Sequence, residues 1–192
     1  CFAFASMLVT TPLAAVTQLA SQVFFPMLAS AMREDRDKAE RQFRRGKLVF
    51  TALALVFVWG ACFVGPPIVH LMHLKKSFDG LVWMVPLLGL RASLDIFVAP
   101  TGSALFAAGA SRYSAWANVV RLIVLVGGLY FTVGRWGLSG AIWVLVGAPA
   151  ISYLALLPGL RRQFPGALGV ELATLLMFWT GAGVALALLY SR

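Results

Sequence analysis

Charged residues and cysteines are scarce in this chain of 192 residues. Asp, Glu, Lys and Arg together make up only 12% of it, and there are two cysteines. Soluble domains usually carry about 25% charged residues, so the composition excludes an ordinary water-soluble domain. Cys1 and Cys62 are too few for a disulfide framework. Cys62 lies in an apolar run, where we expect a small buried side chain and no disulfide.

Several common chemical signatures are also missing. The sequence has no nucleotide-binding loop, no Gly-x-Ser-x-Gly, no acid pair at catalytic spacing and no zinc signature. His70 and His73 are three residues apart, but no cysteine or acidic cluster accompanies them, so we predict no metal site and no cofactor. Nothing in the sequence indicates an enzyme. The first residues carry neither a Met nor a basic region, so we expect no signal peptide and a native start before residue 1.

Long apolar runs dominate what is present. Hydrophobic residues make up 60% of the chain, and the mean hydropathy is +0.86. A transmembrane helix needs about 20 apolar residues, and without strand alternation only helices satisfy the backbone in lipid. The sequence predicts an all-α, polytopic integral membrane helix bundle of about six transmembrane helices. The first is so long that it must tilt, kink at Pro12 or Pro26, or run past the membrane surface. The predicted segments are 2–32, 48–72, 81–108, 116–134, 138–160 and 172–190.

The basic residues gather in short loops between these segments. The net charge is +9, but this placement favours a bilayer surface over nucleic acid. The loop 33–47 carries seven positive and four negative charges, and Ala39 and Phe43 suit a short amphipathic helix on the membrane surface. With Arg112, Arg161 and Arg162, this side has ten positive charges against four on the other. We assign it to the cytoplasm, and we expect a bacterial inner membrane because no eukaryotic sorting signal is visible.

Three stretches, in this order, resemble the polysaccharide flippases of the multidrug, oligosaccharidyl-lipid and polysaccharide exporter superfamily. One closes a long helix and leads into a charged loop, one joins two helices of the family's second lobe, and one is similar to its glycine-rich hairpin. The order and spacing carry the resemblance. The stretches are Ala20–Ser30 with Asp35–Glu40, Ala104–Gly109 with Arg112–Tyr113 and Asn118–Arg121, and Gly134–Ala141.

The resemblance implies a two-lobed transporter with a central cavity. Residues 1–165 would form most of the second six-helix lobe without its first helix, and residues 166–192 an additional C-terminal helix. Such flippases move undecaprenyl-diphosphate-linked oligosaccharide to the periplasmic leaflet by alternating access, for O-antigen, lipopolysaccharide or exopolysaccharide biosynthesis. The implied partners are this lipid-linked substrate, the bilayer and the N-terminal lobe that is absent from this chain.

Two charged residues lie deep in the third segment. Arg91 is ten residues into it, about 15 Å from its start at 1.5 Å per residue. A charge near mid-membrane is costly and should face protein or water, and its guanidinium suits bidentate binding of a diphosphate. Asp95 is a candidate site for a coupling proton or Na⁺. The alternative is that Arg91 and Asp95, four residues apart, form a structural ion pair.

Other polar residues are weaker candidates. Arg121 is five residues past Trp116, so headgroup anchoring is favoured over substrate binding. Gln18 and Gln22, together with Thr17 and Ser21, are expected to line a cavity for sugar hydroxyls or to bond neighbouring helices.

Other functions also fit the composition. A drug or cation extruder of the same superfamily should have more intramembrane acids. A membrane-embedded glycan polymerase or ligase should have large outside loops with catalytic residues, and the loops here are short. A purely structural subunit has no use for a mid-membrane Arg and Asp.

Overall fold

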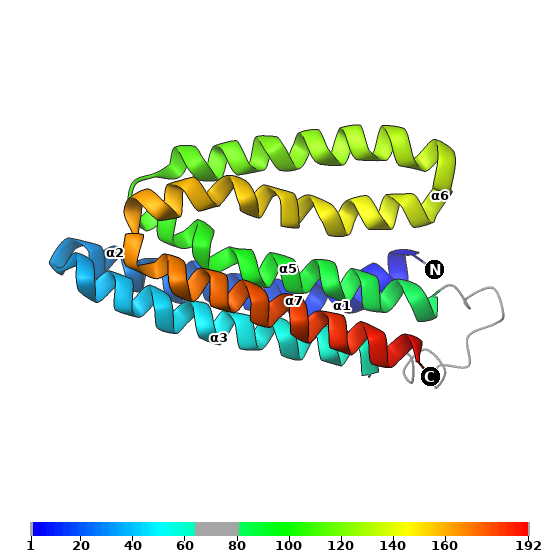
Figure 1. Cartoon of the computed structure of the whole chain (residues 1–192), viewed down its shortest axis with the longest axis horizontal. Coiled ribbons are helices and arrows are strands. Elements are labelled where there is room, and N and C mark those ends of the chain that lie inside the picture. Colours follow the sequence, from blue (N-terminus) through cyan, green and yellow to red (C-terminus); the bar gives the residue numbers. More distant parts are fainter. Residues whose placement is uncertain (1, 64–80, 192) are drawn as a thin grey trace.

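The computed structural model describes residues 2–63 and 81–191, which form helices and short connections with no strand among them. Five helices in these ranges are long and apolar enough to cross a membrane: the run of α1 and α2, then α3, α5, α6 and α7. The all-α prediction is confirmed (Figure 1). The elements are α1 Phe2–Leu19, the π-helix η1 Ala20–Phe24, α2 Phe25–Glu34, α3 Arg36–Phe63, α5 Leu81–Ala107, α6 Ser111–Gln163, the short 3-10 helix η3 Pro165–Ala167 and α7 Leu168–Tyr190.

Some predictions fall outside the described residues. They concern the last part of the segment 48–72, the histidines His70 and His73, and the outside loop with Lys75 and Lys76. Cys1 also lies outside the described ranges, whereas Cys62 is a buried free thiol, as its apolar surroundings predict.

The first predicted segment is interrupted before Pro26 and not at Pro12. The π-helix η1 separates α1 from α2, and Pro26 stands in the first turn of α2. A proline has no N–H to donate, and its ring clashes with the carbonyl four residues earlier. The wider turn of the π-helix before Pro26 accommodates both the missing hydrogen bond and the proline ring.

The charged stretch 33–47 is mostly helical and not a loop, which corrects the prediction. The backbone is extended only at Asp35, where φ is −159°, and its Oδ1 accepts the N–H of Asp37 at 2.9 Å, as at a helix N-cap. From Arg36 the chain runs into α3 without a break. Ala39 and Phe43 form an apolar face that is buried in the bundle, and they belong to α3 and not to the separate surface helix that was expected.

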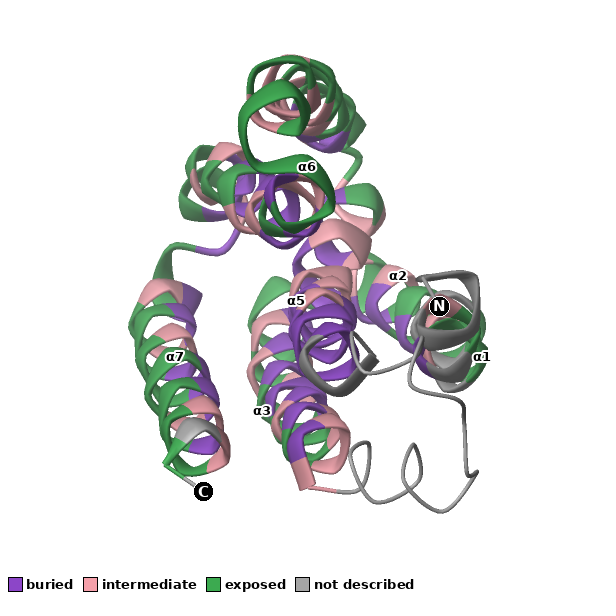
Figure 2. Ribbon diagram, turned by 90° about the vertical axis from the view of Figure 1, so that its right-hand side faces the viewer, coloured by how far each residue is buried: buried purple, intermediate pink, exposed green. Residues whose placement is uncertain are grey.

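The helix α5 is the centre of the bundle. It packs against α1, α2, α3 and α6, and almost all its residues from Met84 to Phe97 are buried (Figure 2). Apart from a few polar residues such as Arg91 and Asp95, its sequence is apolar around the whole helix, which is typical of a helix surrounded by others. Pro86 and Pro100 lie within it. The bounds agree with the predicted segment 81–108.

The helix α6 folds back on itself as a hairpin. Its two arms, residues 111–136 and 138–163, contain the predicted segments 116–134 and 138–160 (Figure 1). The turn lies at Gly137, where φ is 55° and ψ is −138°. Because only glycine adopts this backbone region readily, the sequence Arg135-Trp136-Gly137 makes the tight turn that was predicted there.

Three connections meet at one end of the bundle. The α2–α3, α5–α6 and α6–α7 connections lie together, opposite the Gly137 turn and the C-terminus (Figure 1). They are the three loops that the charge count assigns to one side of a membrane. The arrangement is therefore compatible with that assignment, and the side of the membrane stays a prediction.

Gly137→Ala tests the hairpin turn. A Cβ at this φ is strained, so we expect unfolding in detergent to become easier by about 1–3 kcal/mol. The matched control is Gly134→Ala, because Gly134 has no positive φ and its added Cβ meets no neighbour within 4 Å. Thermal or denaturant unfolding measures both. Equal stability of the two variants would contradict the role of Gly137.

Candidate functional site

A cavity of about 470 Å³ lies between α1, α5 and both arms of α6. Its wall is mixed: leucine, valine and alanine alternate with hydroxyl, amide and charged groups. The polar side chains come from all three helices, so the cavity depends on tertiary packing. Its polar lining residues are Thr10, Thr17, Asp95, Ser114, Asn118, Arg121 and Ser152.

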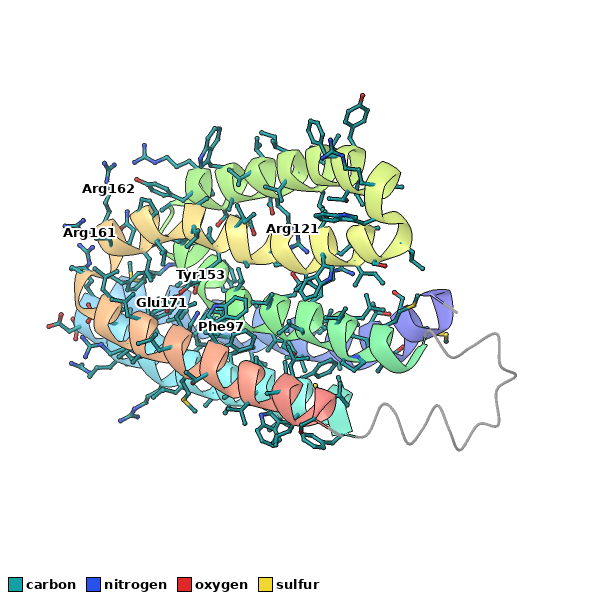
Figure 3. The ribbon with its side chains drawn as sticks, turned by 45° about the vertical axis from the view of Figure 1, so that its right-hand side comes forward. Phe97, Arg121, Tyr153, Arg161, Arg162 and Glu171 are labelled. Atoms are coloured by element: carbon teal, nitrogen blue, oxygen red, sulfur yellow. The ribbon has the colours of Figure 1, made fainter. Side chains whose placement is uncertain are left out.

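An ion pair between α5 and α6 is the main electrostatic feature of this cavity. Arg121 Nη2 lies 3.0 Å from Asp95 Oδ1, with side-chain exposures of 32% and 18%. Because α6 begins at Ser111 and not near Trp116, Arg121 is about 15 Å along the helix. Arg121 therefore lies at the cavity, paired with Asp95 (Figure 3), and headgroup anchoring stays a prediction.

Arg91 is placed elsewhere. It lines a void of only about 10 Å³ against α1, with Ser6, Val9 and Thr10 on the opposite wall. Its Nε is buried and has no hydrogen-bond partner among the described residues. The Arg91–Asp95 pair that the spacing allowed is not formed, since the recorded partner of Asp95 is Arg121. The structure thus brings Asp95 and Arg121 together at the cavity, without Arg91.

The polar face predicted on the first segment is divided. Thr17 lines the cavity, but its hydroxyl already donates to the carbonyl of Ala14 at 2.9 Å. Gln18 and Gln22 are exposed and are not among the residues that line this cavity. Adjacent residues of a helix point in different directions, and Gln22 stands in η1, where the helical period changes.

One hydroxyl in the cavity has an unmet hydrogen bond. Ser114 Oγ is buried, and the described residues offer it no partner. Buried polar atoms are nearly always paired with protein or water. Ser114 therefore marks a place where water or a ligand hydroxyl would be bound.

A second polar site, which the sequence analysis missed, ties α3 to α7. Lys47 and Glu171 form an ion pair at 2.9 Å with side-chain exposures of 0% and 1%. Lys47 was counted as a cytoplasmic loop charge, and this is wrong, because it is a buried residue of α3.

The surrounding helices α5 and α6 complete this network. Lys47 Nζ donates to the carbonyl of Phe97 at 2.9 Å and to Thr101 Oγ1 at 3.0 Å. Thr101 in turn donates to Glu171 Oε1 at 2.8 Å, as does the hydroxyl of Tyr153 at 2.5 Å. The ammonium also lies 3.6 Å from the centroid of the Phe97 ring, a favourable cation–π contact. Figure 3 labels three members of this network: Phe97 on α5, Tyr153 on α6 and Glu171 on α7.

A signal for this pair was present in the sequence. Glu171 is an isolated acid in the first turn of α7, next to a long apolar run. Lys47 is the last charge before another such run. A charged residue at the end of an apolar run can be exposed at the surface or buried in the core. Here the packing of α7 on α3 buries both residues.

No family model matches this sequence, and comparisons with curated proteins and with solved structures found no match either. The resemblance to polysaccharide flippases therefore stays a prediction from the residue patterns. The lipid-linked substrate, the absent lobe and the bacterial inner membrane stay predictions with it. The cavity and its ion pair are the observations from which a function is argued.

Lys47→Met tests the buried network. Removing one partner leaves Glu171 charged and buried, which costs about 3–5 kcal/mol of unfolding free energy. The matched control is Lys38→Met, which removes a 2.5 Å pair with Glu34 that is half-exposed and should cost about 1 kcal/mol or less. Denaturant unfolding in micelles measures the difference.

The double variant Lys47→Met/Glu171→Leu should recover most of this loss, because neither charge is then left unpaired. A double variant as unstable as Lys47→Met would show that the network does not act through its charges.

Proposed function

We propose that this chain is a membrane-spanning part of a flippase for lipid-linked oligosaccharide, with the α1–α5–α6 cavity as its substrate site. The single observation that carries the proposal is the Asp95–Arg121 pair, which stands deep in the helices and faces a cavity with a mixed polar and apolar wall. Ion pairs in apolar helices are costly and generally mark function.

The outer surface of the helices supports a bilayer location. The first arm of α6 exposes large apolar side chains along its length, among them Tyr130 at 80% and Phe131 at 70%. A soluble monomer seldom exposes a continuous apolar surface of this kind. In a bilayer the same side chains would contact acyl chains.

The charge in the cavity favours an anionic cargo. The guanidinium of Arg121 would bind a diphosphate by two parallel hydrogen bonds. Hydroxyls and amides such as Ser114 and Asn118 would bond the sugars. A drug or cation extruder would need more acids than Asp95 alone among the lining residues.

Asp95 would control the availability of Arg121. In the pair, the carboxylate neutralises the guanidinium, so an arriving diphosphate must replace Asp95. Protonation of Asp95, or binding of Na⁺ to it, would release Arg121 and favour the substrate. Substrate binding and ion coupling would then share one pair of side chains, with Asp95 as the ion site.

A second lobe belongs to this proposal. The cavity is partly open, and only one set of helices lines it. The flippase resemblance supplies an N-terminal lobe for the other wall. Transport would then be a property of the intact protein that contains this chain.

Arg121→Gln tests the proposed site. In proteoliposomes with the intact protein, we expect transport of labelled undecaprenyl-diphosphate oligosaccharide to fall at least tenfold, because the variant loses a charge-assisted contact of about 1.5–3 kcal/mol.

Asp95→Asn should keep substrate binding but lose the response to an ion gradient.

Arg135→Gln is the control, since it removes an exposed arginine in the Gly137 turn, away from the cavity. Thermal unfolding verifies that each variant is folded. Normal transport by folded Arg121→Gln would overturn the proposal, and so would an equal loss in Arg135→Gln.

A further inference from the structure

A groove of about 670 Å³ separates the second arm of α6 from α7. Its walls are mainly apolar, and its volume lies within the usual range for small-molecule sites, about 300–1,000 Å³. It is distinct from the Asp95–Arg121 cavity, because the two have no lining residue in common. The residues lining it are Tyr153, Leu154, Leu157, Pro158, Arg161 and Arg162 from α6, and Leu168, Glu171, Leu172 and Leu175 from α7.

Each wall is a regular helix face whose outer residues lack a helical partner. The lining residues recur three and four positions apart on both helices, which is the spacing of a packing face. However, α7 packs mainly on α3 and meets α6 at the Tyr153–Glu171 hydrogen bond, and Leu154 and Leu172 are each 57% exposed. Figure 2 shows α7 standing away from the α6 hairpin. The two leucine faces are therefore left to a third component.

Two arginines stand at one end of the groove. Arg161 and Arg162 are exposed at the end of α6 where the α6–α7 connection lies (Figure 3). Arg162 donates to the hydroxyl of Tyr113 at 3.0 Å, and the described residues give Arg161 no ion-pair or hydrogen-bond partner. The guanidiniums have donors left for a phosphate, which they bind in bidentate geometry.

An unsatisfied acceptor lies in the wall of the groove. Glu171 uses Oε1 for Lys47, Thr101 and Tyr153, whereas its Oε2 is buried with no partner in the described part of the chain. A buried carboxylate oxygen without a donor is costly. A ligand with a hydroxyl donor near its phosphate would satisfy it.

We propose that this groove binds one anionic glycerophospholipid, with its acyl chains along the leucines and its phosphate on Arg161 and Arg162. The headgroup hydroxyls of a phosphatidylglycerol would supply the donor for Glu171. The arrangement of the groove fits such a lipid, since the two arginines lie at the end of the bundle and the leucine-lined surface extends from them along the helices. The inference does not depend on the transported substrate.

Native mass spectrometry of the purified protein with phosphatidylglycerol or phosphatidylcholine tests this proposal. We expect phosphatidylglycerol to bind at least tenfold more tightly. Arg161→Gln/Arg162→Gln should reduce this preference to within about twofold, since each basic residue contributes roughly equally to binding anionic lipid. Arg161→Gln alone should lose part of the preference for phosphatidylglycerol. Because Arg161 bonds no described residue, this single variant also serves as a check if the double variant misfolds.

Matched controls separate the groove from the general surface. Arg33→Gln/Arg45→Gln removes two other exposed arginines and should keep the preference. Leu172→Trp fills the groove and should weaken binding of both lipids, whereas Leu176→Trp, at another exposed leucine of α7 that lies outside the groove, should not.

Three results would overturn the proposal. One is equal binding of the two lipids, and another is an equal loss in Arg33→Gln/Arg45→Gln, which would indicate unspecific surface charge. The third is displacement of phosphatidylglycerol by inorganic phosphate, which would indicate an anion site without a role for acyl chains. All three are distinguishable from failed transport, because no transport is measured.

Discussion

The buried ion pair between Lys47 and Glu171 is the constraint on which the arrangement of helices depends. Removing two charges from water costs several kcal/mol per ion, and good geometry must repay it. Here four helices compensate the cost. Helices α3 and α7 supply the two charges, and α5 and α6 supply the hydrogen-bonding groups: Thr101, the Phe97 carbonyl and Tyr153. Helix α7 is thereby fixed on α3, which leaves its leucine face open beside α6.

The central helix α5 connects this network to the cavity. Phe97 and Thr101 face Lys47, while Asp95 and Gly102 line the cavity on another side of the same helix. A rotation or shift of α5 would therefore change both polar sites. Pro86 and Pro100 lie in this helix and remove two backbone donors. These are the places where α5 would bend with the least loss of hydrogen bonds.

The hydropathy pattern and the positions of Gly and Pro predicted the helices well. They could not predict which residues the charged side chains pair with. The hairpin at Gly137 and the interruption at Pro26 follow from local backbone chemistry, which a sequence displays. Asp95 has an arginine four residues away on its own helix, yet it pairs with Arg121 from α6. That choice depends on how α6 is rotated against α5, which no local pattern contains. The burial of Lys47 was missed for the same reason, because α7 lies far along the chain.

The two ion pairs differ in a way that assigns them different roles. The Lys47–Glu171 pair is almost completely buried, so replacing either partner would leave an uncompensated charge, and exchange is prohibitively costly. The Asp95–Arg121 pair is partly exposed to a cavity that also holds the unpartnered hydroxyl of Ser114. Because water in this cavity can hydrate the separated groups, parting Asp95 from Arg121 costs less than parting the fully buried pair. The buried pair therefore fixes the helices, and the partly exposed pair is the one that we propose a substrate opens.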